Sequence, residues 1–164
     1  MDAAPFPPDT RRMRTGLNIL WFIFGGFFMG LGWWITGVVL AITIIGIPWA
    51  RAAFEMGSFC FHPFGREVVN RAALTGRVDV GTGLPGFFGN VIWFVLAGWW
   101  LALGHVLAGL ANCLSIIGIP FGIQHFKLAA ISLAPIGKTV VLNELATKVR
   151  ERTAAEEYER MRGN

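Results

Sequence analysis

The sequence predicts an all-α, polytopic membrane protein made of two parallel tandem repeats, each a short transmembrane helical hairpin broken at Gly-x-Pro plus an interfacial helix. Residues 15–50 and 80–126 contain no Asp, Glu, Lys or Arg. A bilayer crossing needs roughly 20 apolar residues. Each window therefore has room for two crossings, although the first window, residues 15–50, is barely long enough. The second observation is an internal repeat at a spacing of 72 residues, which suggests that each window belongs to one copy of the same unit.

The basic residues favour one orientation for the whole chain. All 14 Lys and Arg lie outside the two windows, in residues 1–14, 51–79 and from 127 onward. A net charge of +4 would also suit nucleic acid, but basic residues that flank apolar segments fix membrane orientation, so we expect no nucleic-acid partner. Two crossings per repeat put both termini and the middle segment in the cytoplasm and relate the copies by an axis along the membrane normal. A cleaved signal peptide is disfavoured, because the apolar run is longer than about 15 residues.

The repeat aligns residues 18–69 with 90–141 without a gap, and 17 of these 52 positions are identical. Asn-x-x-Trp begins at Asn18 and Asn90, and Ile-Ile-Gly-Ile-Pro recurs intact at 44–48 and 116–120. A closing Pro-(Phe/Ile)-Gly-(Arg/Lys)-x-Val-Val follows in both copies. These motifs resemble the YccF family of small bacterial inner-membrane proteins over about residues 15–142. The resemblance implies a multi-pass protein of the bacterial inner membrane with a duplicated domain, and it brings no activity with it.

The chain divides into five segments on these grounds. They are a cytoplasmic Pro/Arg leader (1–15), a first YccF-like repeat (16–69), a linker (70–89), a second repeat (90–142) and a charged cytoplasmic helix (143–164). Trp33 and Trp34 are expected at the far turn of the first hairpin, with Trp21 and Trp49 near the cytoplasmic interface. The rise from Trp21 to Trp33 is only about 18 Å, so a full crossing and a re-entrant hairpin both stay open.

Two further helices are expected after the Gly-x-Pro motifs, over residues 49–61 and 121–133. Both stretches are apolar with a few polar residues, which suits an interfacial helix that ends before Pro63 or Pro135, with Gly65 or Gly137 in the turn. Asn18 and Asn90 are expected to cap the first helix of each repeat.

The paired Gly-x-Pro motifs are the first candidate site. Gly46 with Pro48, and Gly118 with Pro120, interrupt both copies at the same place, and paired interruptions of this kind can mark a binding site or a pathway. The alternative is a structural kink that places each proline in the first turn of the next helix. Thr43 and Ser115, one turn earlier, are expected to satisfy freed backbone groups in either case.

A polar series occurs in the second copy alone, where His105, Asn112 and Ser115 replace Trp33, Leu40 and Thr43. The spacing places them on one helical face, a candidate route for a solute or a proton. Alternatively, His105 lies near the far turn and faces water. Arg66 and Lys138 are candidates for lipid headgroup contact or for simple anchoring.

No enzyme is predicted, because the sequence shows no nucleophile with a nearby base and no phosphate-binding loop. Cys60 and Cys113 occupy non-equivalent positions of the two copies, so we expect both to be unpaired, with no metal site and no cofactor. Two functions remain open. One is an oligomeric small channel or transporter for ions or small solutes, and the other is an accessory or scaffold protein that packs against a larger membrane protein. Membrane lipids are expected partners in both cases.

Overall fold

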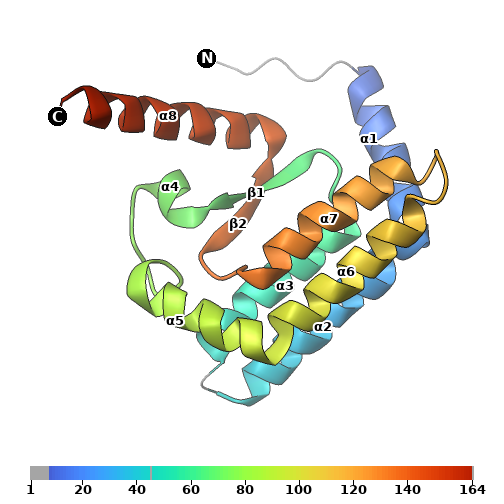
Figure 1. Cartoon of the computed structure of the whole chain (residues 1–164), viewed down its shortest axis with the longest axis horizontal. Coiled ribbons are helices and arrows are strands. Elements are labelled where there is room, and N and C mark those ends of the chain that lie inside the picture. Colours follow the sequence, from blue (N-terminus) through green and yellow to red (C-terminus); the bar gives the residue numbers. More distant parts are fainter. Residues whose placement is uncertain (1–7, 45, 164) are drawn as a thin grey trace.

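A computed structural model describes residues 8–44 and 46–163, so residues 1–7 of the leader, Ile45 of the first Gly-x-Pro motif and Asn164 lie outside it. The fold is mostly helical (Figure 1). The elements, in chain order, are α1 (Pro8–Trp21), the π-helical turn η1 (Phe22–Gly26), α2 (Phe27–Ile42), α3 (Ile47–Phe61), β1 (Arg66–Asn70), α4 (Arg71–Thr75), α5 (Gly83–Trp93), η2 (Phe94–Gly98), α6 (Trp99–Asn112), α7 (Ile119–Leu133), β2 (Lys138–Leu142) and α8 (Asn143–Arg162).

Each repeat begins with one long helix that bends at a π-helical turn. The bend lies at η1 between α1 and α2, and at η2 between α5 and α6 (Figure 1). Gly25 in η1 has φ of 144°, a conformation that glycine adopts without steric cost. Gly26 and Gly98 follow at equivalent positions, where a Cβ would overlap the rings of Trp21 and Trp93. The bend therefore depends on small residues at these places.

The expected far turn at Trp33 and Trp34 is wrong, because α2 continues through both residues to Ile42. The chain reverses instead at the Ile-Ile-Gly-Ile-Pro motif, between α2 and α3 and again between α6 and α7. The motif is therefore a turn between two packed helices and not a break within one. Pro48 and Pro120 stand in the first turn of α3 and α7, where a missing N–H costs no helical hydrogen bond.

The expected helices are present as α3 and α7, and their position at the membrane interface stays a prediction. They form the middle layer of the fold, between the α2/α6 layer and the strands (Figure 1). One charged side chain of each helix faces the strands: the Glu55 carboxylate accepts hydrogen bonds from the Thr139 hydroxyl and from the Val140 amide at 2.8 Å. In α7 the equivalent residue is Lys127, whose Nζ atom lies 3.9 Å from Oε1 of Glu67. Glu55 and Lys127 thus both have partners inside the protein.

The all-α prediction is also wrong, because β1 and β2 pair as a two-stranded antiparallel sheet. Each strand follows a Pro-x-Gly turn in which Gly65 and Gly137 have φ of 91° and 86°, as the turn prediction required. The Val-Val pairs have the β-branched side chains that favour strands. Val68 pairs with its own equivalent, Val140, so the sheet joins one repeat to the other symmetrically.

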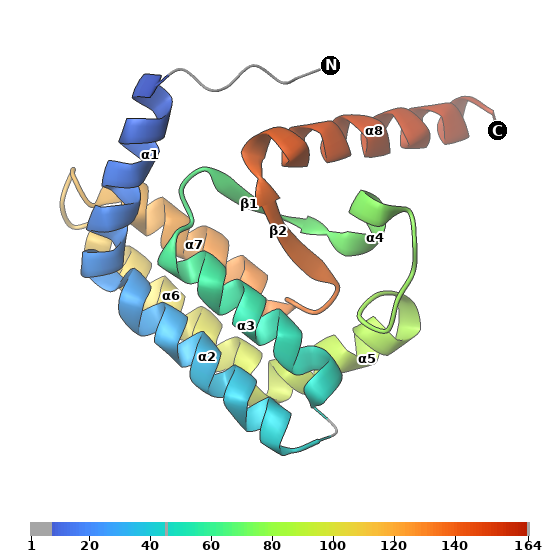
Figure 2. The same cartoon turned by 180° about the vertical axis from the view of Figure 1, so that it is seen from behind.

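The two repeats are related by a pseudo-twofold axis, here called the pseudo-dyad, which passes through the sheet and between α2 and α6. At its far end Trp33 of α2 donates a hydrogen bond to His105 of α6, the equivalent residue. Figures 1 and 2 show α2 and α6 running in opposite directions. Each repeat therefore exchanges contacts with the other across the axis, and the predicted orientation of that axis along the membrane normal stays a prediction.

Asn18 and Asn90 do not cap helices. The Asn18 side chain donates to the Phe64 carbonyl at 3.1 Å and accepts from the Phe64 amide at 2.9 Å, and Asn90 makes the same two bonds to Ile136. Three residues later, the Trp21 indole donates to the Cys60 carbonyl, as Trp93 does to that of Ser132. The Asn-x-x-Trp motif thus fastens the first helix of each repeat to the turn that leads into its strand.

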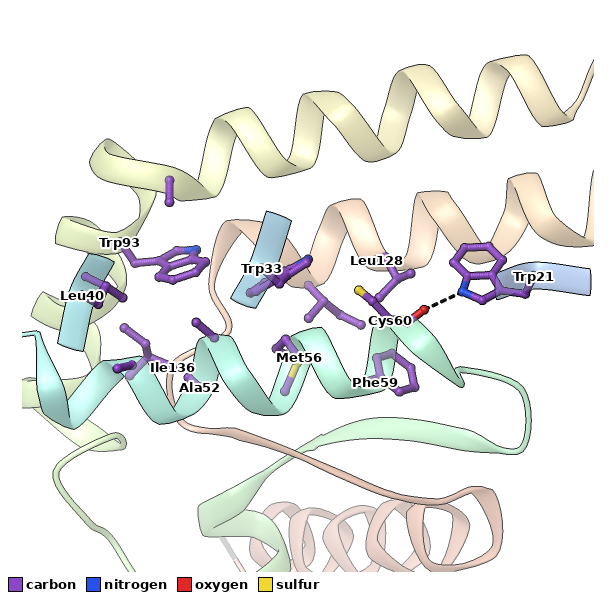
Figure 3. Close-up of a cluster of buried hydrophobic side chains, with 14 of the residues drawn as sticks. Trp21, Trp33, Leu40, Ala52, Met56, Phe59, Cys60, Trp93, Leu128 and Ile136 are labelled. Carbon is purple, nitrogen blue, oxygen red and sulfur yellow. Dashed lines mark hydrogen bonds between the residues drawn. The ribbon is translucent and has the colours of Figure 1, made fainter. Parts of the chain in front are cut away.

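Tryptophan rings fill the centre of the molecule. Trp33 and Trp93 stack with centroids 5.2 Å apart, and Trp21 lies at the other end of the same core, beside Cys60 and Leu128 (Figure 3). The glycines of the repeat let the helices approach these rings and one another. A Cβ at Gly37 or Gly109 would meet the ring of Phe54 or Phe126. Packing, rather than ligand contact, accounts for them.

The charged C-terminal helix is confirmed as α8, and it projects from the body beside the short helix α4 (Figure 1). Near its start, Glu144 pairs with Arg14 of α1 at 3.1 Å. Arg150 pairs with Glu67 of β1 at 2.7 Å. The first turns of α8 are thereby tied to both ends of the first repeat.

Candidate functional site

A buried polar cluster lies where the pseudo-dyad meets α2 and α6. The Nδ1 atoms of His105 and His125 are 3.0 Å apart, and the Trp33 indole donates to His105 Nε2 at 3.3 Å. The Cys60 Sγ lies 4.0 Å from the same nitrogen. All four side chains are fully buried, so this cluster is the main polar feature of an otherwise apolar core.

The hydrogen bonds determine the tautomers of two neutral rings. A neutral imidazole has one N–H donor and one bare nitrogen. Since His105 Nε2 accepts from Trp33, its proton sits on Nδ1 and is donated to His125 Nδ1. The proton of His125 is then on Nε2, which is buried and has no hydrogen-bond partner among the described residues. The hydrogen bonds thus run in one direction, from Trp33 to His105 and from His105 to His125. They end at the Nε2–H group of His125, which donates to no described residue.

The differences between the two copies build this cluster. His125 stands where the first copy has Ala53, His105 where it has Trp33, and Ser132 where it has Cys60. Trp21 of the first copy lies over His125, with ring centroids 4.4 Å apart. Gly25 faces His125 Nε2, and a Cβ there would come within 3.2 Å of that atom. Across the described residues, no group of three or more His, Cys, Asp or Glu side chains could hold a metal ion.

The structure does not bring the predicted polar series together. His105 is in the core rather than at a water-facing turn. Asn112 donates its amide to the Ala108 carbonyl of its own helix at 2.9 Å. Ser115 is exposed in the α6–α7 turn, where its hydroxyl accepts from the Gly118 amide at 3.0 Å. His105 and Asn112 both remain in α6, one in the core and the other at the helix end, while Ser115 lies beyond the helix in the turn.

The two Gly-x-Pro motifs lie at opposite ends of the α2/α6 layer. Thr43 donates to the Leu40 carbonyl at 2.6 Å and accepts from the Gly46 amide at 3.1 Å, so it closes its turn as Ser115 does in the second copy. A Cβ at Gly46 or Gly118 would overlap the carbonyl oxygen of Leu40 or Asn112. Backbone crowding thus requires both glycines, and the prolines start the next helices.

Arg66 is the first residue of β1 and Lys138 the first residue of β2. In the antiparallel sheet Arg66 pairs with Leu142, and Lys138 pairs with Asn70. Arg66 is exposed and lines a hollow with Glu55 and Ser58. Lys138 is half-buried, and this burial lowers the pKa of its ammonium group below the ordinary value. Arg66 alone is thus freely placed for a headgroup.

Sequence reasoning missed His125, Trp33 and Cys60 as members of one cluster. His125 lies in the stretch 121–133, which the sequence alone assigns to an interfacial helix with a few polar residues. A signal was present: on a helix that is apolar on one face, His125 lies three residues before Leu128 and four after Phe121, both core residues. The expectation that both cysteines are unpaired is confirmed.

Removing either histidine should destabilise the fold, and removing both should cost less than the sum. His125→Leu leaves the His105 Nδ1 donor unpaired, and His105→Leu leaves the Trp33 indole unpaired, each at about 1–3 kcal/mol. Because the two rings share one hydrogen bond, a coupling energy of about 0.5–3 kcal/mol is expected. Unfolding by dodecyl sulfate in mixed micelles would measure the four proteins of the cycle. Additive losses would show that the rings do not interact.

The described residues contain two helical stretches that are long and apolar enough to cross a membrane, Thr10–Ile42 and Gly83–Asn112. With the exposed apolar side chains of α2 and α6, they support a membrane location for this protein, which is built on a duplicated unit. Both units, at residues 16–66 and 88–138, match the YccF family, described as an inner membrane component domain, and the chain belongs to that family.

Two curated relatives show how far the similarity extends. They are the inner membrane protein YccF of Escherichia coli (strain K12) and that of Shigella flexneri. Each is 41% identical over 150 residues, which cover 90% of this chain and 100% of the relative. No solved structure matches. The family assignment and the membrane location therefore agree with the resemblance found in the motifs.

Proposed function

We propose that this protein is a non-catalytic accessory protein of the inner membrane, which anchors a charged cytoplasmic platform to the bilayer. The platform is defined here as β1, β2, α4 and α8. The arrangement of α8 is the main support: from Arg150 onward the described residues of this helix are exposed, and it extends past the sheet (Figure 2). A helix that is polar all round and projects from its own fold is suited to a partner in the cytosol.

The centre of the molecule supports this proposal over transport by a single chain. The residues first considered for a route, among them Asn112 and Ser115, bond to nearby backbone. Stacked Trp33 and Trp93 fill part of the core between the repeats. A channel would therefore have to form between chains, with the exposed α2 and α6 faces as its walls, and these faces are apolar.

Flux measurements would test the proposal. The protein is purified in mild detergent, its mass is measured, and it is reconstituted into liposomes loaded with potassium or a small fluorescent solute. We expect flux equal to that of protein-free liposomes. Flux that rises with the amount of protein, and that falls in Asn112→Leu while folding is unchanged, would overturn the accessory role in favour of an oligomeric channel.

The attachment of α8 should depend on pH through Glu67. Arg150 donates a hydrogen bond to the Glu67 carboxylate, and this bond, with the charge of Lys127, lowers the pKa of that carboxyl. The ion pairs therefore stabilise the folded state above the pKa of an unfolded glutamate, about 4.3, and this contribution is lost as the pH falls through the lower folded value. At pH 7 Glu67→Gln should speed proteolysis within α8 about two- to fivefold. Glu156→Gln, at the free end of α8, is the control, and equal rates in both variants would contradict the role of Glu67.

A further inference from the structure

Charged and apolar residues are separated along the pseudo-dyad. The sheet, α8 and the first half of α1 lie towards one end, which contains the Arg14–Glu144 and Arg150–Glu67 ion pairs. The layer of α2 and α6 lies at the other end (Figure 1), and its sequence contains no Asp, Glu, Lys or Arg. Its turns are the most exposed apolar places, with Leu114 91% and Ile116 88% accessible. We call this end, formed by α2, α6 and their turns to α3 and α7, the apolar face.

We propose that the apolar face is embedded in the cytoplasmic leaflet of the membrane, with the pseudo-dyad along the membrane normal and with α2 and α6 lying in the plane of the bilayer. Neither inter-helix turn then reaches the opposite water phase. The two turns lie at the same depth, because the pseudo-dyad exchanges them. The platform stays on the cytoplasmic side, together with all three basic segments, as the distribution of Lys and Arg requires.

A spanning arrangement of α2 and α6 conflicts with their directions. Since the two helices are antiparallel (Figures 1 and 2), spanning would place the α2–α3 turn and the α6–α7 turn in opposite water phases. The pseudo-dyad would then lie in the membrane plane, and the sheet would be level with the middle of the bilayer. Glu67 and Lys127 would be at hydrocarbon depth, where ionised side chains are costly. Placing the axis along the normal removes both conflicts.

The dimensions fit half a bilayer. From Arg14, where α1 still contacts the charged end, to Gly26 the helix rises about 18 Å, and the tilt of α1 shortens its depth. One leaflet contributes about 15 Å of the roughly 30 Å hydrocarbon core. The 16 residues of α2 extend only about 24 Å, which is short for a full crossing. The stretch Thr10–Ile42 is long enough to cross a membrane, but it bends at η1, so its two halves do not form one straight crossing.

The border between the two ends has the charge that an anionic leaflet attracts. Arg51 is exposed and lines a hollow with Pro48 and the apolar Val80. A guanidinium next to apolar surface suits a lipid phosphate above acyl chains. Arg66, also exposed, lies at the start of β1 on the platform side. A leaflet of anionic phospholipid is therefore the occupant that fits this face, rather than a second protein.

Labelling of single cysteines from each side of the membrane tests the placement. The background is Cys60→Ser with Cys113→Ala, which gives each position the residue that the other repeat has there. Thr43→Cys and Ser115→Cys report on equivalent positions of the two turns, and Ala155→Cys on α8 is the platform control. With an impermeant maleimide, we expect Ala155→Cys to react only in inside-out vesicles. Both turn cysteines should react only after the membrane is dissolved in detergent.

Two outcomes would overturn the proposal. If one turn reacts from the periplasmic side and the other from the cytoplasmic side, α2 and α6 span the membrane. If both turns react from the cytoplasmic side, lipid does not cover the apolar face. A second measurement gives a positive signal: a bimane fluorophore on Thr43→Cys or Ser115→Cys should be quenched strongly, and to the same extent, by phospholipids brominated deep in the acyl chain. Weak quenching at either position, with the fold intact, would also contradict the placement.

Discussion

Replacing Trp93 with alanine should lower the free energy of unfolding by about 3–5 kcal/mol, the usual cost of emptying a buried tryptophan site. Trp93 is 1% exposed, stacks on Trp33 and donates to the Ser132 carbonyl at 2.7 Å. The substitution removes the ring that joins the two repeats and leaves a carbonyl at the end of α7 without its donor. Unfolding by dodecyl sulfate in mixed micelles would measure the loss.

Trp100→Ala is the matched control, because Trp100 lies in the same long helix and is 60% exposed. Its removal should change the unfolding free energy in detergent by less than about 0.5 kcal/mol. If Trp100→Ala destabilised the protein as much as Trp93→Ala, the assignment of Trp93 to the core between the repeats would be wrong.

Gly118→Ala is expected to have the second largest effect, a loss of about 3 kcal/mol, at the upper end for overpacking. The added Cβ would overlap the Asn112 carbonyl oxygen, which is backbone and cannot move aside without opening the end of α6. The same variant should shift the melting temperature in detergent downward. A variant that melts with the wild type would show that the α6–α7 turn is wider than the structure has it.

Gly104→Ala provides the control for this prediction. A Cβ at Gly104 would come within 3.2 Å of the Cε of Met29, the far end of a flexible side chain. The higher helix propensity of alanine, about 1 kcal/mol relative to glycine, should offset that contact. We therefore expect Gly104→Ala to be close to neutral, even though both glycines recur in the two repeats.

The sequence predicted the repeat and the helices α3, α7 and α8, because these follow from apolar runs, charge and the positions of Gly and Pro. It predicted the turns at Gly65 and Gly137 for the same reason. It did not predict β1 and β2, since a five-residue strand pairs only when its partner arrives from 72 residues away. Long-range pairing of this kind leaves little trace in local composition.

The candidate site was predicted less well than the fold. Spacing along one helix placed His105, Asn112 and Ser115 on a common face, but α6 ends at Asn112, so Ser115 lies in the turn that follows. The contact of His105 with Trp33, by contrast, depends on the antiparallel packing of α2 and α6. Direction of packing between repeats is set by the whole core, including the Trp21 and Trp93 bonds to the ends of α3 and α7. The spacing of residues within one repeat therefore does not predict the direction in which the two repeats pack.

Cross-linking between the repeats tests the central claim, that they interlock about the pseudo-dyad with α2 and α6 antiparallel. In the Cys60→Ser/Cys113→Ala background, Val39→Cys is paired either with Leu96→Cys or with Ala111→Cys. Val39 and Leu96 line one cleft of about 470 Å³, whereas Ala111 is the repeat equivalent of Val39 and lies near the far end of α6. A short bifunctional thiol reagent should join Val39→Cys to Leu96→Cys and leave the pair with Ala111→Cys unlinked. The reverse result would show that α2 and α6 run in the same direction and would contradict this account.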